Sequence, residues 1–286
     1  MSAPTTVAVN LTGVIETPTM PSSPFLIDED GHPYVPIGAA GVVLGVRLGH
    51  GVFDHDADHA APGVTLAHRD QPARHALTTF ACFGNEALVR TGGAAGERGT
   101  VLGKRGEEGR VIVVFSPDVM ARMAPGDTIV VRGHGQGAQL PAAPGVTLLN
   151  TDPDALRLLP VRVVDGTVHA EVRGVVPSAV VGNGIGRPAQ MWDLDLQLTA
   201  TTADRYQLGG LRLGDLVAVD DLDVRHNAGY RRGWRTVGLM VHGASPLPGH
   251  GPGLMPLLCG PREQLTIDVN AADHAGLSDD NLGFRA

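Results

Sequence analysis

The chain contains little cysteine, few aromatic side chains and no long apolar segment. Its two cysteines, Cys82 and Cys259, are far apart in the 286 residues, so a fold built on disulfides is not expected. Aromatic residues make up 4% of the chain, and the core must therefore consist of Val, Leu, Ala and Ile. Nowhere do about 18 apolar residues follow one another, and residues 1–10 lack the basic start and apolar run of a signal peptide. We therefore expect a soluble, cytoplasmic protein without a membrane partner.

Basic residues are also in short supply. The chain has 22 Lys and Arg against 30 Asp and Glu, which gives a formal net charge of -8. Nucleic-acid binding depends on clustered Lys and Arg that release counterions from the phosphate backbone, and the one basic run, residues 230–235, is short. Nucleic acid is therefore not an expected partner. We expect a small polar molecule as substrate and a homo-oligomer as the assembly.

Glycine and proline, in contrast, are abundant. The 39 Gly and 21 Pro lie between short Val- and Leu-rich runs without a repeat period, which indicates the turns of a β-rich fold. The predicted fold class is mainly β, a β-rich α+β protein with two packed β-rich domains and few short helices. A Pro/Gly/Ala-rich stretch over 133–145 marks the boundary, so we expect an N-terminal domain over 1–138 and a C-terminal domain over 139–286.

Short apolar or alternating runs predict the individual strands. They cover residues 6–14, 63–67, 76–82, 110–115, 128–131 and 237–241. The glycine-rich residues 92–104 are expected to form a turn that leads into the strand at 110. Short helices are expected after Ser116, an N-cap residue followed by Pro117, and after Asp152.

Residues 50–59 hold three histidines and three aspartates, more metal-binding and proton-transferring groups than any other window of this chain. Imidazole and carboxylate together suit zinc, manganese or iron, and the Pro62-Gly63 turn that follows indicates an exposed loop. Asp58 and His59 stand next to this turn, where the loop is best anchored, and are the expected metal ligands; His55 lies further out. The ligand spacing matches no fixed metal motif, so a solvated acidic loop is the alternative.

A second histidine segment covers residues 242–253. His242 follows the apolar run 237–241, at the point where a buried strand would end, and is expected to be a further metal ligand. His250 lies between two glycines, which allow the backbone to approach a ligand closely, and is expected to be a catalytic acid or base. A turn-rich loop with incidental histidines is the alternative.

Four further residues are candidates for catalysis or substrate binding. Glu86 follows an apolar run and is a candidate general base, beside Asn85 as a substrate-binding amide. An ordinary ion-paired residue at a strand end is the alternative for Glu86. Lys104, at the end of the glycine-rich segment, is a candidate for neutralising an anionic substrate or an oxyanion, with a solvated turn lysine as the alternative. Gln136 lies in a glycine-spaced loop and is assigned to substrate binding.

No nucleotide cofactor is expected. Residues 182–187 contain Gly-x-Gly-x-Gly, but the third glycine comes one position too early for the dinucleotide fingerprint. The following residues alternate as a strand does, which would place Asp193, Asp195 and Gln197 on one face. Such a row lines a polar cavity or faces solvent, and Asp195 is the expected substrate-binding member.

Several of these motifs occur together in an order that resembles a known family. They are Asp58-His59, Pro62-Gly63-Val64, Gly84-Asn85-Glu86, residues 99–104, Gly135-Gln136-Gly137, Pro144-Gly145-Val146, Asp152-Pro153 and residues 249–253. Their order resembles the prokaryotic family catalogued as domain of unknown function 4438, over nearly the whole chain. The resemblance implies a compact, β-rich two-part fold and no settled activity.

The first loop of that family resembles Gly-Asp-His-x-Glu-Pro-Gly. This chain has Ala57 and Ala61 where the pattern has glycine and glutamate, whereas Asp58-His59 matches it. The resemblance therefore favours Asp58 and His59 over the outer histidines and aspartates of the loop. A fainter likeness, of class alone, is to metal-dependent amidohydrolases of the formamidase and acetamidase kind, which are β-rich and use Asp-Gly-His loops.

The expected function is a metal-dependent hydrolase that acts on an amide or related C–N bond of a small polar substrate. A bound divalent metal would lower the pKa of a water molecule and polarise the carbonyl group. His59, Glu86 and His250 are accordingly expected around one cavity. A metal-free lyase or isomerase that uses His and Glu as acid and base is one alternative. A non-catalytic ligand-binding or assembly module is the other.

Overall fold

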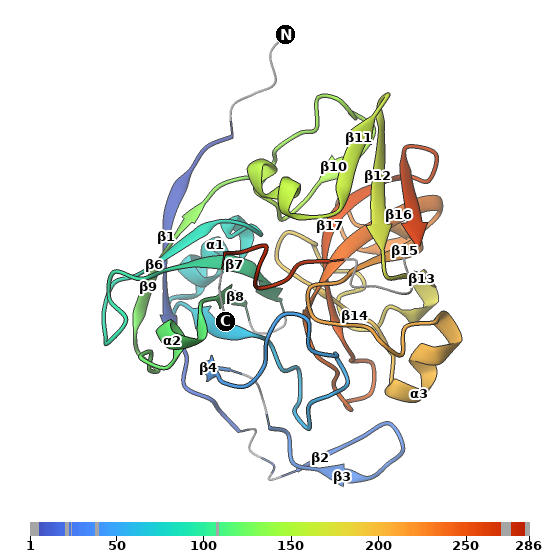
Figure 1. Cartoon of the computed structure of the whole chain (residues 1–286). Coiled ribbons are helices and arrows are strands. Elements are labelled where there is room, and N and C mark those ends of the chain that lie inside the picture. The colour runs from blue at the N-terminus through green and yellow to red at the C-terminus, as the bar shows by residue number, and fades with distance from the viewer. Residues whose placement is uncertain are drawn as a thin grey trace.

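The protein is rich in strands, as predicted. The computed structural model describes residues 6–20, 23, 25–37, 40–106, 109–269 and 276–283. Strands account for 40% of the chain and helices for 11%, which confirms a β-rich fold with few short helices. Figure 1 shows one β-rich half built from the first part of the chain and a second built from the last part, packed side by side.

The first half is a seven-stranded antiparallel sheet. Its strands, in spatial order, are β1 (Val9–Ile15), β9 (Thr128–Gly133), β6 (Glu86–Val89), β7 (Arg98–Arg105), β8 (Arg110–Val114), β5 (Gly63–Ala67) and β4 (Val42–Val43). β1 also pairs with β5, where Val14 lies opposite Ala67, so six of the strands close on themselves. Every residue of β5 and β8 is buried, because both faces of these strands are covered.

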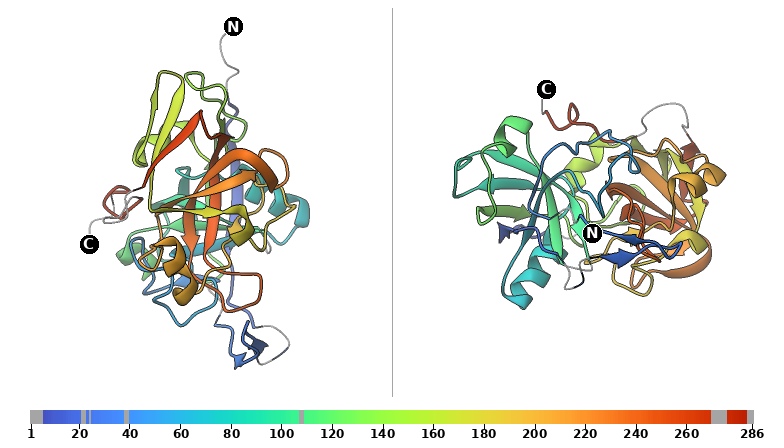
Figure 2. Two further views of the ribbon diagram at one scale, coloured as in Figure 1. Left: turned by 90° about the vertical axis from the view of Figure 1, so that its right-hand side faces the viewer. Right: turned by 90° about the horizontal axis from the view of Figure 1, so that it is seen from below.

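The second half contains a six-stranded and a three-stranded sheet. The larger sheet has the order β10 (Thr147–Leu148), β17 (Gly253–Pro261), β16 (Gly229–His242), β15 (Leu216–Asp223) and β13 (Gly174–Pro177), with β14 (Leu194–Asp195) also paired to β17. The smaller sheet contains β11 (Val161–Val164), β12 (Thr167–Val172) and β18 (Leu265–Val269). A separate hairpin, β2 (Leu26–Ile27) and β3 (Pro33–Tyr34), projects from the body in Figure 1 and in the left view of Figure 2.

The helices are short. They are α1 (Gln71–Phe80), α2 (Pro117–Met120) and α3 (Ala200–Ala203), with 3-10 segments η1 (Pro153–Leu158), η2 (Ser178–Val180) and η3 (Asp204–Tyr206). Ser116 precedes α2 and Asp152 precedes η1, as predicted, although the second is a 3-10 turn.

Two sequence predictions about the first half are wrong. The strand expected over 76–82 is the end of α1, because Asp70 accepts a hydrogen bond from the Ala73 N–H at 3.0 Å and Pro72 favours the first helical turn. The turn expected over 92–104 ends early, because β7 begins at Arg98 and pairs with both β6 and β8.

The two halves are joined by backbone hydrogen bonds between a loop of the first and the end of β16. The N–H of His59 donates to the carbonyl of Ala244 at 3.0 Å, and the N–H of Gly243 donates to the carbonyl of Ala60 at 2.7 Å. The loop therefore lies directly beside His242. The boundary expected at residue 138 falls in the connection between β9 and β10. None of the helices in the described residues is long and apolar enough to span a bilayer.

The capping of α1 gives a stability prediction. Asp70→Ala removes the side chain that satisfies the Ala73 N–H and should lower the free energy of unfolding by about 1 kcal/mol, measured by urea denaturation. Ser116→Ala is the matched control, because Ser116 caps α2 without a side-chain hydrogen bond. Equal losses in the two variants would show that the Asp70 cap is not what stabilises α1.

Candidate functional site

The inner end of the His/Asp loop is buried, whereas its outer part is exposed. Asp54 and Asp56 are exposed, as expected of a loop, but His59 is only 4% exposed. His59 also has a φ of 55°, a left-handed conformation that a non-glycine residue adopts only where its surroundings hold it. The hydrogen bond from the His59 N–H to the carbonyl of Ala244 fixes this backbone conformation. The prediction of a wholly exposed loop is therefore wrong for the residues nearest Pro62.

Asp58 orients the His59 ring. Asp58 Oδ1 lies 2.6 Å from His59 Nδ1, which leaves His59 Nε2 facing Asp195. Burial alone would raise the pKa of Asp58, but hydrogen bonds from His59 and Ser245 hold that pKa below its usual value. Burial alone would lower the pKa of His59, but the carboxylates of Asp195 and Asp58 raise it.

Asp195 lies at the centre of the site and is 2% exposed. Its Oδ2 is 2.9 Å from His250 Nδ1 and 3.7 Å from His59 Nε2, and its Oδ1 is 3.4 Å from His242 Nε2. Burial would raise the pKa of this carboxyl, but the three imidazoles hold it far below its usual value. Despite these short distances, Oδ2 accepts no hydrogen bond of acceptable geometry from any described residue.

A glycine allows His242 to reach Asp195. Strand β17 runs between β14 and β16, and its first residue, Gly253, lies opposite both Asp195 and His242. A Cβ atom at Gly253 would lie 2.0 Å from His242 Nε2, so any side chain there would displace the imidazole. The absence of a side chain on the middle strand therefore brings together residues from its two neighbours.

His242 is held at both ring nitrogens. Nδ1 lies 2.9 Å from the carbonyl oxygen of Gly243, which can only accept, so Nδ1 carries the proton. Nε2 lies 2.8 Å from Asp193 Oδ2, and the N–H of Gly106 donates to Asp193 Oδ1 at 2.9 Å. Burial lowers the pKa of His242, but Asp193 and Asp195 outweigh it and raise the pKa to about 10. In the metal-free protein His242 is therefore an imidazolium ion between two carboxylates.

Three of these residues fit a divalent metal. His59 Nε2 lies 3.1 Å from His250 Nδ1 and 3.7 Å from Asp195 Oδ2, and the latter two atoms lie 2.9 Å apart. A tetrahedral ion bound at about 2.0–2.1 Å separates its ligands by about 3.3 Å, close to these values. The Asp58 carboxylate on His59 Nδ1 is also the support that metal-binding histidines commonly have. Asp193, Asp195 and His242 form a second such group, but Asp193 and His242 already bond each other and the backbone.

Sequence analysis left open whether Asp193 and Asp195 line a polar cavity or face solvent, and the structure buries both. Asp193 is 5% exposed and Asp195 is 2% exposed, whereas Gln197 is exposed. Only Leu194–Asp195 form a strand, so the three residues do not share one face of a longer strand. The signal available in the sequence was the apolar pair Leu194 and Leu196 on either side of Asp195, which are buried as well.

Glu86, Asn85 and Gln136 make their printed contacts with residues outside this cluster. Glu86 is exposed and forms an ion pair with Arg98 on the neighbouring strand, so the structure brings His59 and His250 together without Glu86. Asn85 is buried and shapes a turn, accepting from the Cys82 N–H at 2.8 Å. Gln136 donates to the carbonyl of Thr79 at 3.1 Å.

Lys104 is fully buried, which contradicts the alternative prediction of a solvated lysine in a turn. Its Nζ donates to Asn150 Oδ1 at 3.0 Å and to the carbonyl of Gln190 at 2.8 Å, so it connects the two halves. Burial lowers its pKa to about 8. With both contacts made to the protein and no exposed surface, Lys104 is placed to stabilise the junction between the halves.

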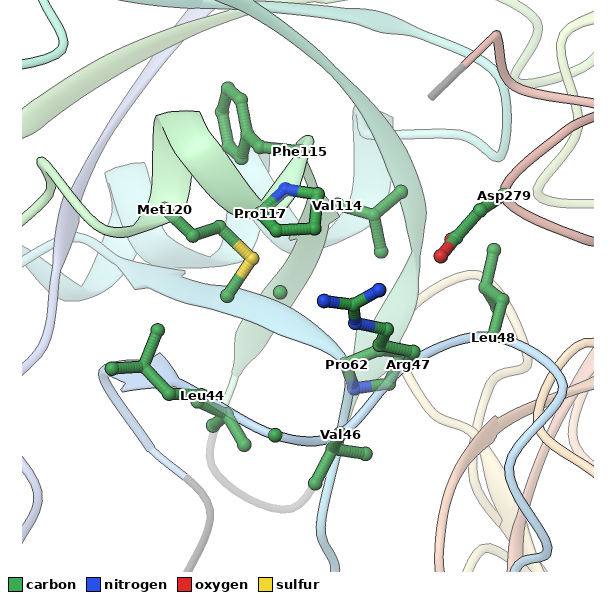
Figure 3. A pocket seen from close by; sticks show the side chains of 13 residues that line it. Leu44, Val46, Arg47, Leu48, Pro62, Val114, Phe115, Pro117, Met120 and Asp279 are labelled. Atoms are coloured by element: carbon green, nitrogen blue, oxygen red, sulfur yellow. The ribbon is translucent and has the colours of Figure 1, made fainter. Parts of the chain in front are cut away.

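Two cavities lie near the His/Asp loop. One, of about 290 Å³, is lined by Asp58 and by residues 244–246. Figure 3 shows the other, of about 120 Å³, where apolar side chains such as Phe115 and Met120 surround Arg47 and Asp279. Of these two cavities, only the first is lined by a residue, Asp58, that contacts His59.

The buried ammonium of Lys104 gives a pH prediction. Its pKa is about 8 in the folded protein and 10.5 in the unfolded chain, so the folded state binds fewer protons between these values. The free energy of unfolding should therefore rise over this interval, by up to about 3 kcal/mol. The Lys104→Met variant should lack this rise in the free energy of unfolding, measured by urea denaturation from about pH 7 to about pH 10.5. The raised pKa of Cys82 acts in the opposite direction in both proteins, and loss of the Lys104 charge in the variant strengthens this opposing effect. If the free energies of unfolding of the wild type and Lys104→Met changed with pH in parallel, the prediction would be wrong.

Comparison with known proteins finds a family of unknown function. The family model described as domain of unknown function (DUF4438), N-terminal, matches residues 25–157, and its C-terminal counterpart matches residues 158–278. The crystal structure of a protein designated TM1086 is similar, with a TM-score of 0.91 and 30% identity over 97% of this chain and 96% of that chain. No functionally curated protein matches. The chain belongs to the DUF4438 family, as the order of its motifs predicted.

Proposed function

We propose that this protein is a metal-dependent hydrolase whose metal is held by His59, His250 and Asp195. The observation that carries the proposal is the convergence of two imidazole nitrogens and one carboxylate oxygen at separations of 2.9–3.7 Å. The Asp195 oxygen among them is buried without a well-formed hydrogen bond, which is the environment that a cation would satisfy. Imidazole and carboxylate ligands favour zinc, manganese or iron.

The proposed chemistry follows from what such a centre can do. A divalent cation bound here would supply a water molecule of lowered pKa and would polarise a carbonyl group. Asp58 would hold the His59 proton on Nδ1 and keep Nε2 directed at the centre. The side chain of His250 is 18% exposed, against 6% for His59, so the centre is most accessible from the His250 side. An amide or related C–N bond of a small polar molecule is the proposed substrate class. The cytoplasmic location and the homo-oligomer stay predictions.

A metal-free acid–base enzyme is a second candidate, because one observation favours it. His59 Nε2 and His250 Nδ1 lie 3.1 Å apart, a distance at which one nitrogen must donate a proton to the other if no metal lies between them. The carboxylates that raise the pKa of His59 would suit an acid that operates near neutral pH. Metal content separates the hydrolase from this lyase or isomerase and from a non-catalytic binding module, since neither alternative needs a metal.

The metal site is tested by substitution and elemental analysis. Asp195→Asn, close to the native side chain in size, should lower metal content after refilling with zinc, manganese or iron(II) to below about a tenth of an ion per chain, because a carboxylate ligand is lost. His59→Ala should do the same. Asp58→Asn should weaken metal binding by about 10- to 100-fold, as loss of a group supporting a ligand does. Because His59 is buried, thermal unfolding of each variant should be recorded alongside.

Two histidines serve as controls. His55→Ala in the outer loop and His226→Ala, an exposed residue, should retain the metal content of the wild type. Less than about a tenth of an ion per wild-type chain after refilling would rule out the metal centre, since catalysis needs the ion in place. Equal losses at His55 and His59 would show that the ligands lie elsewhere in the loop. With metal bound, hydrolysis of a panel of small amides tests the reaction, and activity should follow metal content.

A further inference from the structure

The cavity beside Asp58 is built from four segments that are distant in sequence. It is lined by residues 34–35 at the end of β3, by residues between 53 and 58, by residues 198–200 before and within α3, and by residues 244–246 after β16. Its volume of about 290 Å³ is at the lower limit of ligand pockets. A small molecule is therefore the appropriate occupant. We call this cavity the Tyr34 pocket.

Tyr34 lines the pocket and carries a buried hydrogen-bond donor. Its Oη atom is buried and has no hydrogen-bond partner among the described residues. Burial raises the pKa of this phenol to about 12, and the nearby charges of Asp58 and Asp28 add to the effect, so the hydroxyl keeps its proton at neutral pH. An unpaired buried donor is costly, and a ligand oxygen that accepts from it would remove that cost.

Asp58 brings an acceptor. One of its oxygens faces His59 Nδ1, and Ser245 also bonds the carboxylate. A carboxylate offers about four lone-pair positions, so it can still accept a hydrogen bond from a ligand N–H. The pocket thus presents a donor and an acceptor, which match the carbonyl oxygen and the N–H of an amide.

The remaining lining is mostly apolar, with a second carboxylate, the His55 imidazole and the hydroxyls of Thr199 and Ser245. Phe53, Leu198 and Pro246 offer an apolar surface for a short aliphatic group. Asp56 adds a second carboxylate, and no lysine or arginine of the described residues lines the cavity. The charge of the buried Arg105 acts on Asp58 and offsets part of its charge, but it leaves Asp56 as the charge on the lining. A ligand with a carboxylate at its aliphatic end would meet repulsion there.

We propose that the Tyr34 pocket binds small uncharged aliphatic amides, with the carbonyl oxygen accepting from Tyr34 and the amide N–H donating to Asp58. The ligand class follows from the pocket alone. Its use as a substrate rests on the proposed function, because only the metal centre would supply the hydrolytic chemistry.

Binding of two matched probes tests this assignment. Butyramide carries a neutral aliphatic end, and succinamate carries a carboxylate at the same end. Dissociation constants measured by ligand-observed NMR, on metal-free and on zinc-loaded protein, should be at least about tenfold weaker for succinamate. Asp56→Asn should reduce that difference.

Substitution of Tyr34 provides the second test. Tyr34→Phe should weaken butyramide binding about five- to tenfold, the value of one hydrogen bond, while metal content stays unchanged. Tyr230→Phe is the matched control, because Tyr230 is 71% exposed and does not line the pocket, and it should bind like the wild type.

The outcomes separate the pocket from the metal centre. No butyramide binding, equal binding by Tyr34→Phe, or equal affinity for the two probes would overturn the amide pocket even if the protein holds metal. Tyr34-dependent binding of butyramide by a protein that retains no metal would support the pocket and count against the hydrolase. Tyr34-dependent binding together with retained metal would support both.

Discussion

The arrangement of the whole site depends on the burial of one carboxylate. Asp195 is 2% exposed, and an ionised carboxyl in such a place costs several kcal/mol unless it is compensated. The compensation comes from His59, His242 and His250, which arrive from both halves of the molecule. The loop that carries His59 must therefore lie against the end of β16, and the hydrogen bond from His59 to Ala244 fixes it there.

Protons and a metal ion would compete for the same compensating role. In the metal-free protein the negative charges of Asp58, Asp193 and Asp195 are balanced by protonated imidazole, above all at His242, with buried Lys104 and Arg105 nearby. A cation between His59, His250 and Asp195 would replace imidazole protons and leave His242 to hold the second oxygen of Asp195. His242 is thus better placed to position Asp195, the proposed ligand, than to bind the same ion itself, because Asp193 and Gly243 already occupy its two nitrogens.

The sequence predicted the parts of this site that depend on local patterns. The apolar run 237–241 placed His242 at a strand end, and Asp58-His59 stood out beside Pro62-Gly63. It did not predict that Asp195 is the shared partner, because that depends on Gly253 lying opposite both Asp195 and His242 in a sheet whose strands are far apart in the chain. Glu86 was selected for its place after an apolar run, but its strand face points it at Arg98. The helix α1 was missed because its second half, rich in Leu and Thr, has the composition of a strand, whereas the decisive signal was the cap at Asp70.

Asp58 connects the Tyr34 pocket to the residues of the proposed metal centre. The same carboxylate lines the pocket and holds His59 Nδ1 at 2.6 Å. Its lone pairs are limited, so a ligand N–H that bonded Asp58 would draw electron density from the contact with His59 and make that imidazole a weaker electron donor at Nε2. Conversely, a cation on Nε2 makes the Nδ1–H of His59 more acidic and strengthens its bond to Asp58. The left-handed backbone of His59 and its bond to Ala244 keep the ring from moving away in response. The proposed pocket and the proposed metal centre would therefore be coupled through the 2.6 Å contact between Asp58 and His59, with no rearrangement of the fold required.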